Sequence, residues 1–210
     1  DLVRSRGLGD VYKRQTSVFA MLMSAPSRIT EVLALPVDCE VFETDREGIE
    51  RYGWRFFAGK GYEGDIKWIP TVMVGIAKTA VARARVLSEN ARQLAKWIEK
   101  HPNKFYRHAN CPSVADDEPL TMKQVCMALG FAHYSKKTCR SCLGNRGLAK
   151  EDGVHTLNSL WQHTMARLPD GFPWFDKDKG IRYSNALFVL NVNQFHGNRG
   201  CIPVELHLSL

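Results

Sequence analysis

The sequence has no long apolar run, which excludes one class of protein. None of its stretches approaches the roughly eighteen consecutive apolar residues that a membrane-spanning helix requires. It also lacks the regular cysteine spacing of a disulfide-stapled domain, and its 6 scattered cysteines indicate the reduced thiols of a cytoplasmic protein. With 44% hydrophobic residues among 210, the chain can bury one sizeable core or two small ones.

Acidic residues are in the minority. The chain has 22 Asp and Glu residues against 29 Lys and Arg residues, which gives a formal net charge of +7. A basic chain suits a polyanionic partner, but charge alone does not choose between DNA, RNA and a membrane surface.

Residues 1–15 have a peculiar sequence. Their last six residues resemble a translation of the transposase mosaic end used in sequencing-library adapters. We therefore interpret residues 1–15 as adapter read-through and leave them out of the fold prediction. The alternative is a basic N-terminal arm that follows a DNA backbone, because the stretch holds four basic and two acidic residues. Without it the net charge falls from +7 to +5.

The segment 25–35 predicts a short helix opened by Pro26 and ended by Pro36. Arg28 then lies in its first turn. Apolar residues three or four positions apart give the helix one apolar face: Ile29, Val32, Leu33 and Leu35.

A second segment, Gly59-Lys60-Gly61, lies between two strand-like runs. In the first run Tyr52, Trp54 and Phe56 alternate with Gly53, Arg55 and Phe57, which is typical of a half-buried strand. The second run covers residues 66–70, and a further strand is expected over residues 39–44. Together they predict a three-stranded antiparallel sheet, with Lys60 in the turn between its second and third strands.

These two segments resemble the catalytic domain of the tyrosine recombinase (phage integrase) family. The resemblance rests on Arg28-Ile-x-Glu31-x-Leu-x-Leu followed by the hairpin with Lys60, and it covers residues 16–100. It implies an α+β fold, mainly helical, with the small antiparallel sheet packed on helices. It also implies that Arg28 and Lys60 are catalytic and that Glu31 supports them, and we add Arg55 and Lys67 as candidate DNA contacts.

The family reaction needs no metal and no cofactor. A tyrosine hydroxyl attacks the scissile DNA phosphate, forms a 3′-phosphotyrosyl link and releases a 5′-hydroxyl. Arginines neutralise the charge on the phosphate oxygens, and the hairpin lysine suits protonation of the leaving oxygen. The resemblance further implies double-stranded DNA as partner, a homo-tetramer on two duplexes when full length, no membrane partner, and a bacterial cytoplasmic, nucleoid-associated location.

The second half of the family site, His-x-x-Arg followed downstream by a tyrosine, is not convincingly present. His196-Gly197-Asn198-Arg199 has the letters, but its glycines favour a loop over a helix. No tyrosine follows Arg199, and Tyr134 and Tyr183 precede it. We therefore expect residues 101–210 to be an elaboration of the same domain that is cut before the second box, and we expect no DNA cleavage from this fragment alone.

Beyond the sheet, a long helix is expected from an N-cap at Thr71 to a stop at His101. Its apolar stripe comprises Ile76, Ala80, Ala84, Leu87, Ala91, Leu94 and Ile98, and its basic face Lys78, Arg83, Arg85, Arg92 and Lys96. Further helices are expected over residues 121–130 and 157–168, and residues 172–175 read as an aromatic loop filling a core.

A second functional hypothesis comes from cysteine and histidine spacing. Cys139 and Cys142 form one C-x-x-C, and His108 with Cys111 could supply a second pair of ligands for a structural zinc. The chain would then be a non-catalytic basic DNA-binding module, clipped by zinc, in which Arg28 and Lys60 are structural. Free thiols are the alternative reading of these cysteines.

Overall fold

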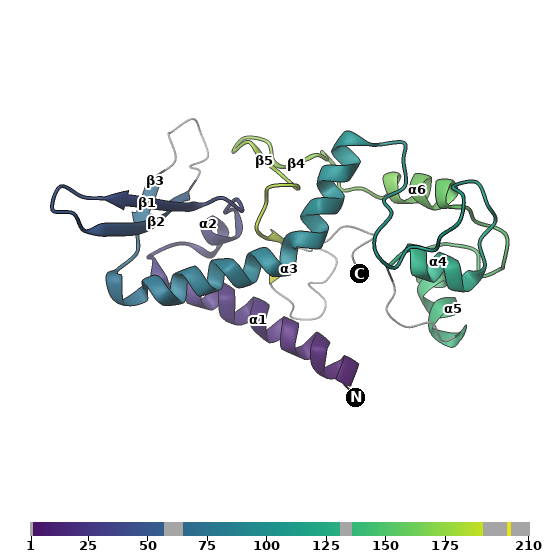
Figure 1. Cartoon of the computed structure of the whole chain (residues 1–210), viewed down its shortest axis with the longest axis horizontal. Coiled ribbons are helices and arrows are strands. Elements are labelled where there is room, and N and C mark those ends of the chain that lie inside the picture. The colour runs from purple at the N-terminus through teal and green to yellow at the C-terminus, as the bar shows by residue number, and fades with distance from the viewer. Residues whose placement is uncertain (1, 57–64, 131–135, 191–200, 203–210) are drawn as a thin grey trace. The chain divides into compact units, whose positions relative to one another are not determined.

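The computed structural model describes residues 2–56, 65–130, 136–190 and 201–202, and the chain divides into two compact units (Figure 1). Unit 1 comprises Asp1–Arg92 and Pro173–Glu205, and unit 2 comprises Gln93–Phe172 and Leu206–Leu210. Within the described residues, no helix has the length and apolar character needed to cross a membrane.

Unit 1 is an α+β structure, as the sequence predicts. Its helices are α1 (Leu2–Ser24), α2 (Ile29–Leu33) and most of α3 (Val74–Lys100), which a 3₁₀ turn, η1 (Thr71–Met73), precedes. Its strands are β1 (Glu40–Thr44), β2 (Glu50–Phe56), β3 (Asp65–Trp68), β4 (Trp174–Asp176), β5 (Ile181–Arg182), β6 (Val189–Leu190) and β7 (Cys201–Ile202).

Strands β1, β2 and β3 form the expected three-stranded antiparallel sheet, in that order. The turn from β1 to β2 is closed by Asp45, whose backbone N–H donates to the Ile49 carbonyl at 3.0 Å. The alternation predicted for β2 is confirmed, because Tyr52, Trp54 and Phe56 are buried while Arg55 is exposed.

A polar network connects the sheet to α3. The Trp54 indole N–H donates to the Tyr52 hydroxyl at 2.9 Å, and that hydroxyl donates to Glu40 at 2.6 Å. Arg85 of α3 completes the network by pairing with Glu40 and by donating to the Val37 carbonyl at 2.8 Å. Burial and the bond to the Glu40 carboxylate both raise the pKa of Tyr52.

The basic face expected on α3 is therefore wrong for two of its members. Arg85 is tied to β1, and Arg92 donates to the Ser88 hydroxyl and the Arg85 carbonyl, both at 3.0 Å. Charge on a helix marks a solvated face only when no acceptor within reach binds it. Here Arg85 finds acceptors before and in β1, and Arg92 finds them on its own helix.

Three helix details also differ from prediction. Helix α2 begins at Ile29 with Arg28 at its N-cap, so Arg28 lies one position before the helix. Thr71 is not an N-cap, because the 3₁₀ turn η1 starts there with Pro70 before it. Ile29 and Ile76 are about half exposed, at 51% and 50%, whereas the alanines of the α3 stripe are buried.

Helix α1 joins residues 2–15 to the following apolar segment without a break.

The chain returns to unit 1 after residue 173. The Val37 N–H donates to the Asn185 carbonyl at 2.8 Å, and the Leu187 N–H donates to the Leu35 carbonyl at 3.0 Å. Leu187 and Phe188 are fully buried in the core of unit 1. The aromatic stretch predicted as a core-filling loop instead forms β4, whose residues are half-buried and pair with β5.

Unit 2 is a group of short helices: α4 (Met122–Ala128), α5 (Lys136–Asn145) and α6 (Leu157–Met165). The capping box of α4 is confirmed, because Thr121 and Gln124 exchange side-chain bonds with each other's backbone N–H. Trp161 of α6 lies edge-on to Phe105 and donates to the Pro102 carbonyl at 2.7 Å. These aromatic contacts form the centre of the unit.

Replacing Gly53 by alanine should destabilise unit 1, since a Cβ there would lie 2.9 Å from the Lys67 carbonyl oxygen and 2.9 Å from the Trp68 ring. We expect Gly53→Ala to lower the free energy of unfolding by about 1–3 kcal/mol in urea denaturation. Gly75→Ala is the matched control, because nothing lies within 4 Å of its Cβ position in helix α3. The control should be neutral or slightly stabilising, and equal destabilisation by both variants would refute this account.

Candidate functional site

The candidate site lies where α2 begins beside the sheet. Arg28 caps α2 with extended backbone angles of φ −75° and ψ 148°, and its side chain is exposed. Among the described residues, no carboxylate forms a salt bridge with the Arg28 guanidinium. The guanidinium therefore projects into solvent from a fixed point of the backbone.

Glu31 fixes that point. Its Oε2 accepts the Arg28 backbone N–H at 2.9 Å and the Lys67 ammonium at 2.7 Å. We call this arrangement of Glu31 between the Arg28 backbone and the Lys67 side chain the carboxylate clamp. It joins the first turn of α2 to strand β3, two elements far apart in the sequence.

Lys67 is held by further contacts. Its ammonium donates to the Pro26 carbonyl at 3.2 Å and to the Ser27 hydroxyl at 3.4 Å. It also lies 4.6 Å from the centre of the Phe56 ring, within the range of a cation–π contact. With its three hydrogens directed at these acceptors, Lys67 is occupied as a structural cation.

The clamp shapes the electrostatics of the site. The hydrogen bond from Lys67, followed by the bond from the Arg28 backbone, holds the pKa of Glu31 below its ordinary value. Glu31 therefore stays ionised and keeps Lys67. The charge of Arg28 also lowers the pKa of Glu31, after the contributions of Lys67, but the salt bridge of Glu31 is formed with Lys67 and not with the Arg28 guanidinium.

The other two sequence candidates stand differently. Arg55 is exposed on β2, and it pairs across the sheet with Ile66, whereas Lys67 pairs with Trp54. Paired residues share a face and neighbours alternate, so Arg55 and Lys67 project from opposite faces of the sheet. Lys60 lies outside the described residues, in the connection that follows the last β2–β3 pair, Phe56 with Asp65.

The structure thus brings together Arg28, Glu31 and Lys67. Sequence reasoning grouped Lys67 with the DNA contacts and missed its role as the partner of Glu31. The available signal was strand alternation, because Lys67 takes the same face as buried Trp54 and Phe56 once the register is known.

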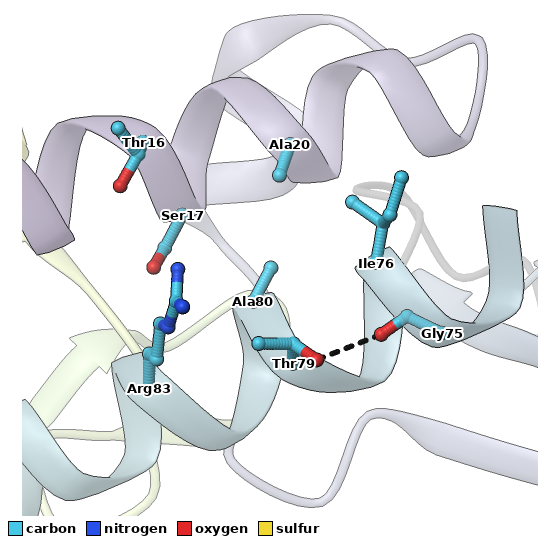
Figure 2. Close-up of a pocket in the computed structure, with 8 residues that line it drawn as sticks. All are labelled: Thr16, Ser17, Ala20, Gly75, Ile76, Thr79, Ala80 and Arg83. Carbon is cyan, nitrogen blue, oxygen red and sulfur yellow. Dashed lines mark hydrogen bonds between the residues drawn. The ribbon is translucent and has the colours of Figure 1, made fainter.

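A separate hollow of about 350 Å³ lies between α1 and α3 of unit 1 (Figure 2). Figure 2 shows the Arg83 side chain pointing toward Ser17 across this hollow. Thr16, Ser17 and Thr79 direct their hydroxyl hydrogens to carbonyls of their own helices at 2.6–2.8 Å. With one cation and no free hydroxyl donor, the hollow has no set of groups suited to catalysis.

The described part of the chain contains no group of three or more His, Cys, Asp or Glu side chains that could hold a zinc ion. The His108 Nε2 lies 3.0 Å from the Ala128 carbonyl oxygen and is engaged there. The side chains of Cys139 and Cys142, and the segment His196–Arg199, lie outside the described part.

Comparisons with known proteins give no family assignment. The chain matches no protein-family model, no curated protein and no solved structure. A proposal for its function therefore depends on its own residues.

Acidification should weaken the carboxylate clamp. The pKa of Glu31 is lowered on folding, so the stabilisation from its charge is complete well above pH 4.5 and is lost as the pH falls through the lower folded value. We expect Glu31→Gln to destabilise the protein by less than about 1 kcal/mol at neutral pH, because the pair is partly exposed. This difference from the wild type should vanish in strong acid.

The measurement is urea denaturation of both proteins across this pH range. Glu43→Gln serves as the control, because Glu43 is an exposed carboxylate of β1 without a salt bridge among the described residues. A Glu31→Gln deficit that persists undiminished at low pH would show that the clamp does not depend on the carboxylate charge.

Proposed function

We propose that this chain supplies the first part of a tyrosine recombinase catalytic domain, in which Arg28 binds the scissile phosphate of double-stranded DNA. The observation that carries the proposal is the exposed Arg28 side chain, whose backbone the carboxylate clamp holds beside a three-stranded antiparallel sheet. The β2–β3 connection of that sheet contains Lys60, the second candidate catalytic residue.

The geometry suits a phosphate ligand. A guanidinium offers a planar set of donors that matches two phosphate oxygens at once. The clamp fixes the backbone from which Arg28 projects, and it pairs Glu31 with Lys67, so the Arg28 guanidinium carries no salt bridge among the described residues. Phosphoryl transfer depends mainly on positioning and charge neutralisation, and an arginine on a fixed backbone contributes to both.

In the proposed reaction, a tyrosine oxygen attacks the phosphorus and the 5′ oxygen leaves. The P–O5′ bond breaks as the 3′-phosphotyrosyl bond forms, and Lys60 gives a proton to the leaving oxygen. Arg28 neutralises the charge on the non-bridging oxygens. The tyrosine and the His-x-x-Arg arginine must come from sequence beyond this chain, so the chain alone binds DNA without cutting it. Assembly as a tetramer on two duplexes in a bacterial cytoplasm belongs to the same proposal.

The cheapest test of this assignment is the coding sequence of the natural gene across both ends of the chain, obtained without transposase-based library chemistry. The recombinase proposal requires an open frame that continues into His-x-x-Arg and a tyrosine. A natural gene that stops at Leu210 would overturn the catalytic proposal and favour a non-catalytic DNA-binding module.

Arg28→Ala should weaken DNA binding because it removes one phosphate contact. We expect the slope of log K against log salt concentration to become shallower by about 0.9 on a duplex, measured by fluorescence anisotropy. Arg46→Ala is the matched control. Arg46 is an exposed arginine of the β1–β2 turn, so its substitution removes the same charge from the same unit. Equal changes in both variants would mean that Arg28 contributes only net charge.

A further inference from the structure

Helix α5 of unit 2 has an outer face made of basic and small residues. Its exposed residues recur at helical spacing: Lys137, Arg140, Ser141 and Gly144. Leu143, beside this row, is fully buried. Positions three and four apart lie on one side of a helix, so these four residues form a single exposed stripe.

Lys150 adds a third cation to this stripe. A Cβ built on Gly144 would lie 2.7 Å from the Lys150 Cε and 3.0 Å from its Nζ, so the lysine side chain lies against the bare backbone of Gly144. The lysine side chain can lie there because Gly144 has no side chain of its own. We name Lys137, Arg140, Ser141, Gly144 and the Lys150 ammonium the cationic face of α5.

No salt bridge neutralises the charges of this face in the described part of the chain, where Lys137, Arg140 and Lys150 have no carboxylate partner. No acidic residue occurs between Lys136 and Lys150. Two acids, Glu151 and Asp152, follow Lys150 directly. Glu151 is exposed, and Asp152 accepts the Met122 backbone N–H at 2.5 Å at the start of α4.

We propose that the cationic face of α5 binds the backbone of double-stranded DNA, as a contact separate from the Arg28 site. Three close cations on one face complement a line of phosphates. The small residues at the centre of the face, Ser141 and Gly144, allow the helix backbone to come close to a groove.

Two other polyanions fit this face less well. Duplex RNA has a major groove too deep and narrow for a helix to read. A membrane-surface helix needs large apolar side chains beside its basic ones, whereas the exposed residues described on α5 are basic, polar or glycine.

Helix α5 is also well supported. It contacts α4, and α4 in turn contacts α6, as the grouping of the three helices in Figure 1 shows. The capping box and the bond from Met122 to Asp152 fix the start of α4. A face presented by a packed helix binds without the entropy cost of ordering a free segment.

The inference uses the DNA partner of the proposed function but different residues, so the two can fail separately. The test is fluorescence anisotropy of the whole chain on a DNA duplex over a range of salt concentrations. We expect Lys137→Ala combined with Arg140→Ala to weaken binding several-fold and to make the salt slope shallower by about two. The same reduction is expected in an Arg28→Ala background.

The matched control is Lys104→Ala combined with Lys123→Ala. Both lysines are exposed in unit 2 and lie outside the cationic face, so the control removes the same net charge. The control should leave the slope nearly unchanged, and equal reductions in the two double variants would overturn the proposal. Tighter binding of an RNA duplex, lost in the Lys137/Arg140 variant, would also overturn it in favour of RNA.

Removal of its charge tests the role of Lys150. Lys150→Ala should make the salt slope shallower by about one. Gly144→Ala shifts the end of the Lys150 side chain without removing its charge, so it should change the slope by less than Lys150→Ala does. An unchanged slope in Lys150→Ala would refute the place of Lys150 in the face.

Discussion

The structure of unit 1 depends on burying the indole of Trp54 with its N–H satisfied. The indole is fully buried on the inner face of the sheet, and an unpaired donor there would cost about 1–3 kcal/mol. Its N–H is satisfied through the Tyr52 hydroxyl, the Glu40 carboxylate and finally Arg85 of α3. One aromatic side chain thereby determines how β1, β2 and the long helix pack together.

The basic residues of the chain divide into two groups with different roles. Arg85 and Lys67 are bound to carbonyls, hydroxyls and carboxylates of other elements and hold those elements together, whereas Arg92 is bound to groups of its own helix. Arg28 and the cationic face of α5 have no salt bridge among the described residues and remain available to an external anion. The net charge of +7 therefore overstates the charge available for binding, and the position of each cation matters more than the sum.

Local patterns in the sequence were sufficient for the three-stranded sheet and for helices α2, α3, α4 and α6. Period-two alternation predicted β2, since every second side chain of a half-buried strand faces the core, and the capping box predicted the start of α4. The order β1-β2-β3 followed because short turns join antiparallel neighbours. The prediction that Arg28 and Glu31 lie together also needed only the sequence, because they are three residues apart at a helix start.

Tertiary structure decided which charges are free, because that depends on acceptors far away in the sequence. The residues that Lys67 contacts lie around Pro26 and Glu31, and Arg85 reaches Val37 and Glu40. Strand register placed Lys67 and Arg55 on opposite faces of the sheet. Two backbone bonds beside Pro36 hold Leu187 and Phe188 in the core of unit 1. The sequence alone determined the three-stranded sheet, the helices α2, α3, α4 and α6, and the basic character of the protein. Only long-range packing decided whether a given cation stabilises the fold or faces a partner, since the two roles need the same side chain in different surroundings.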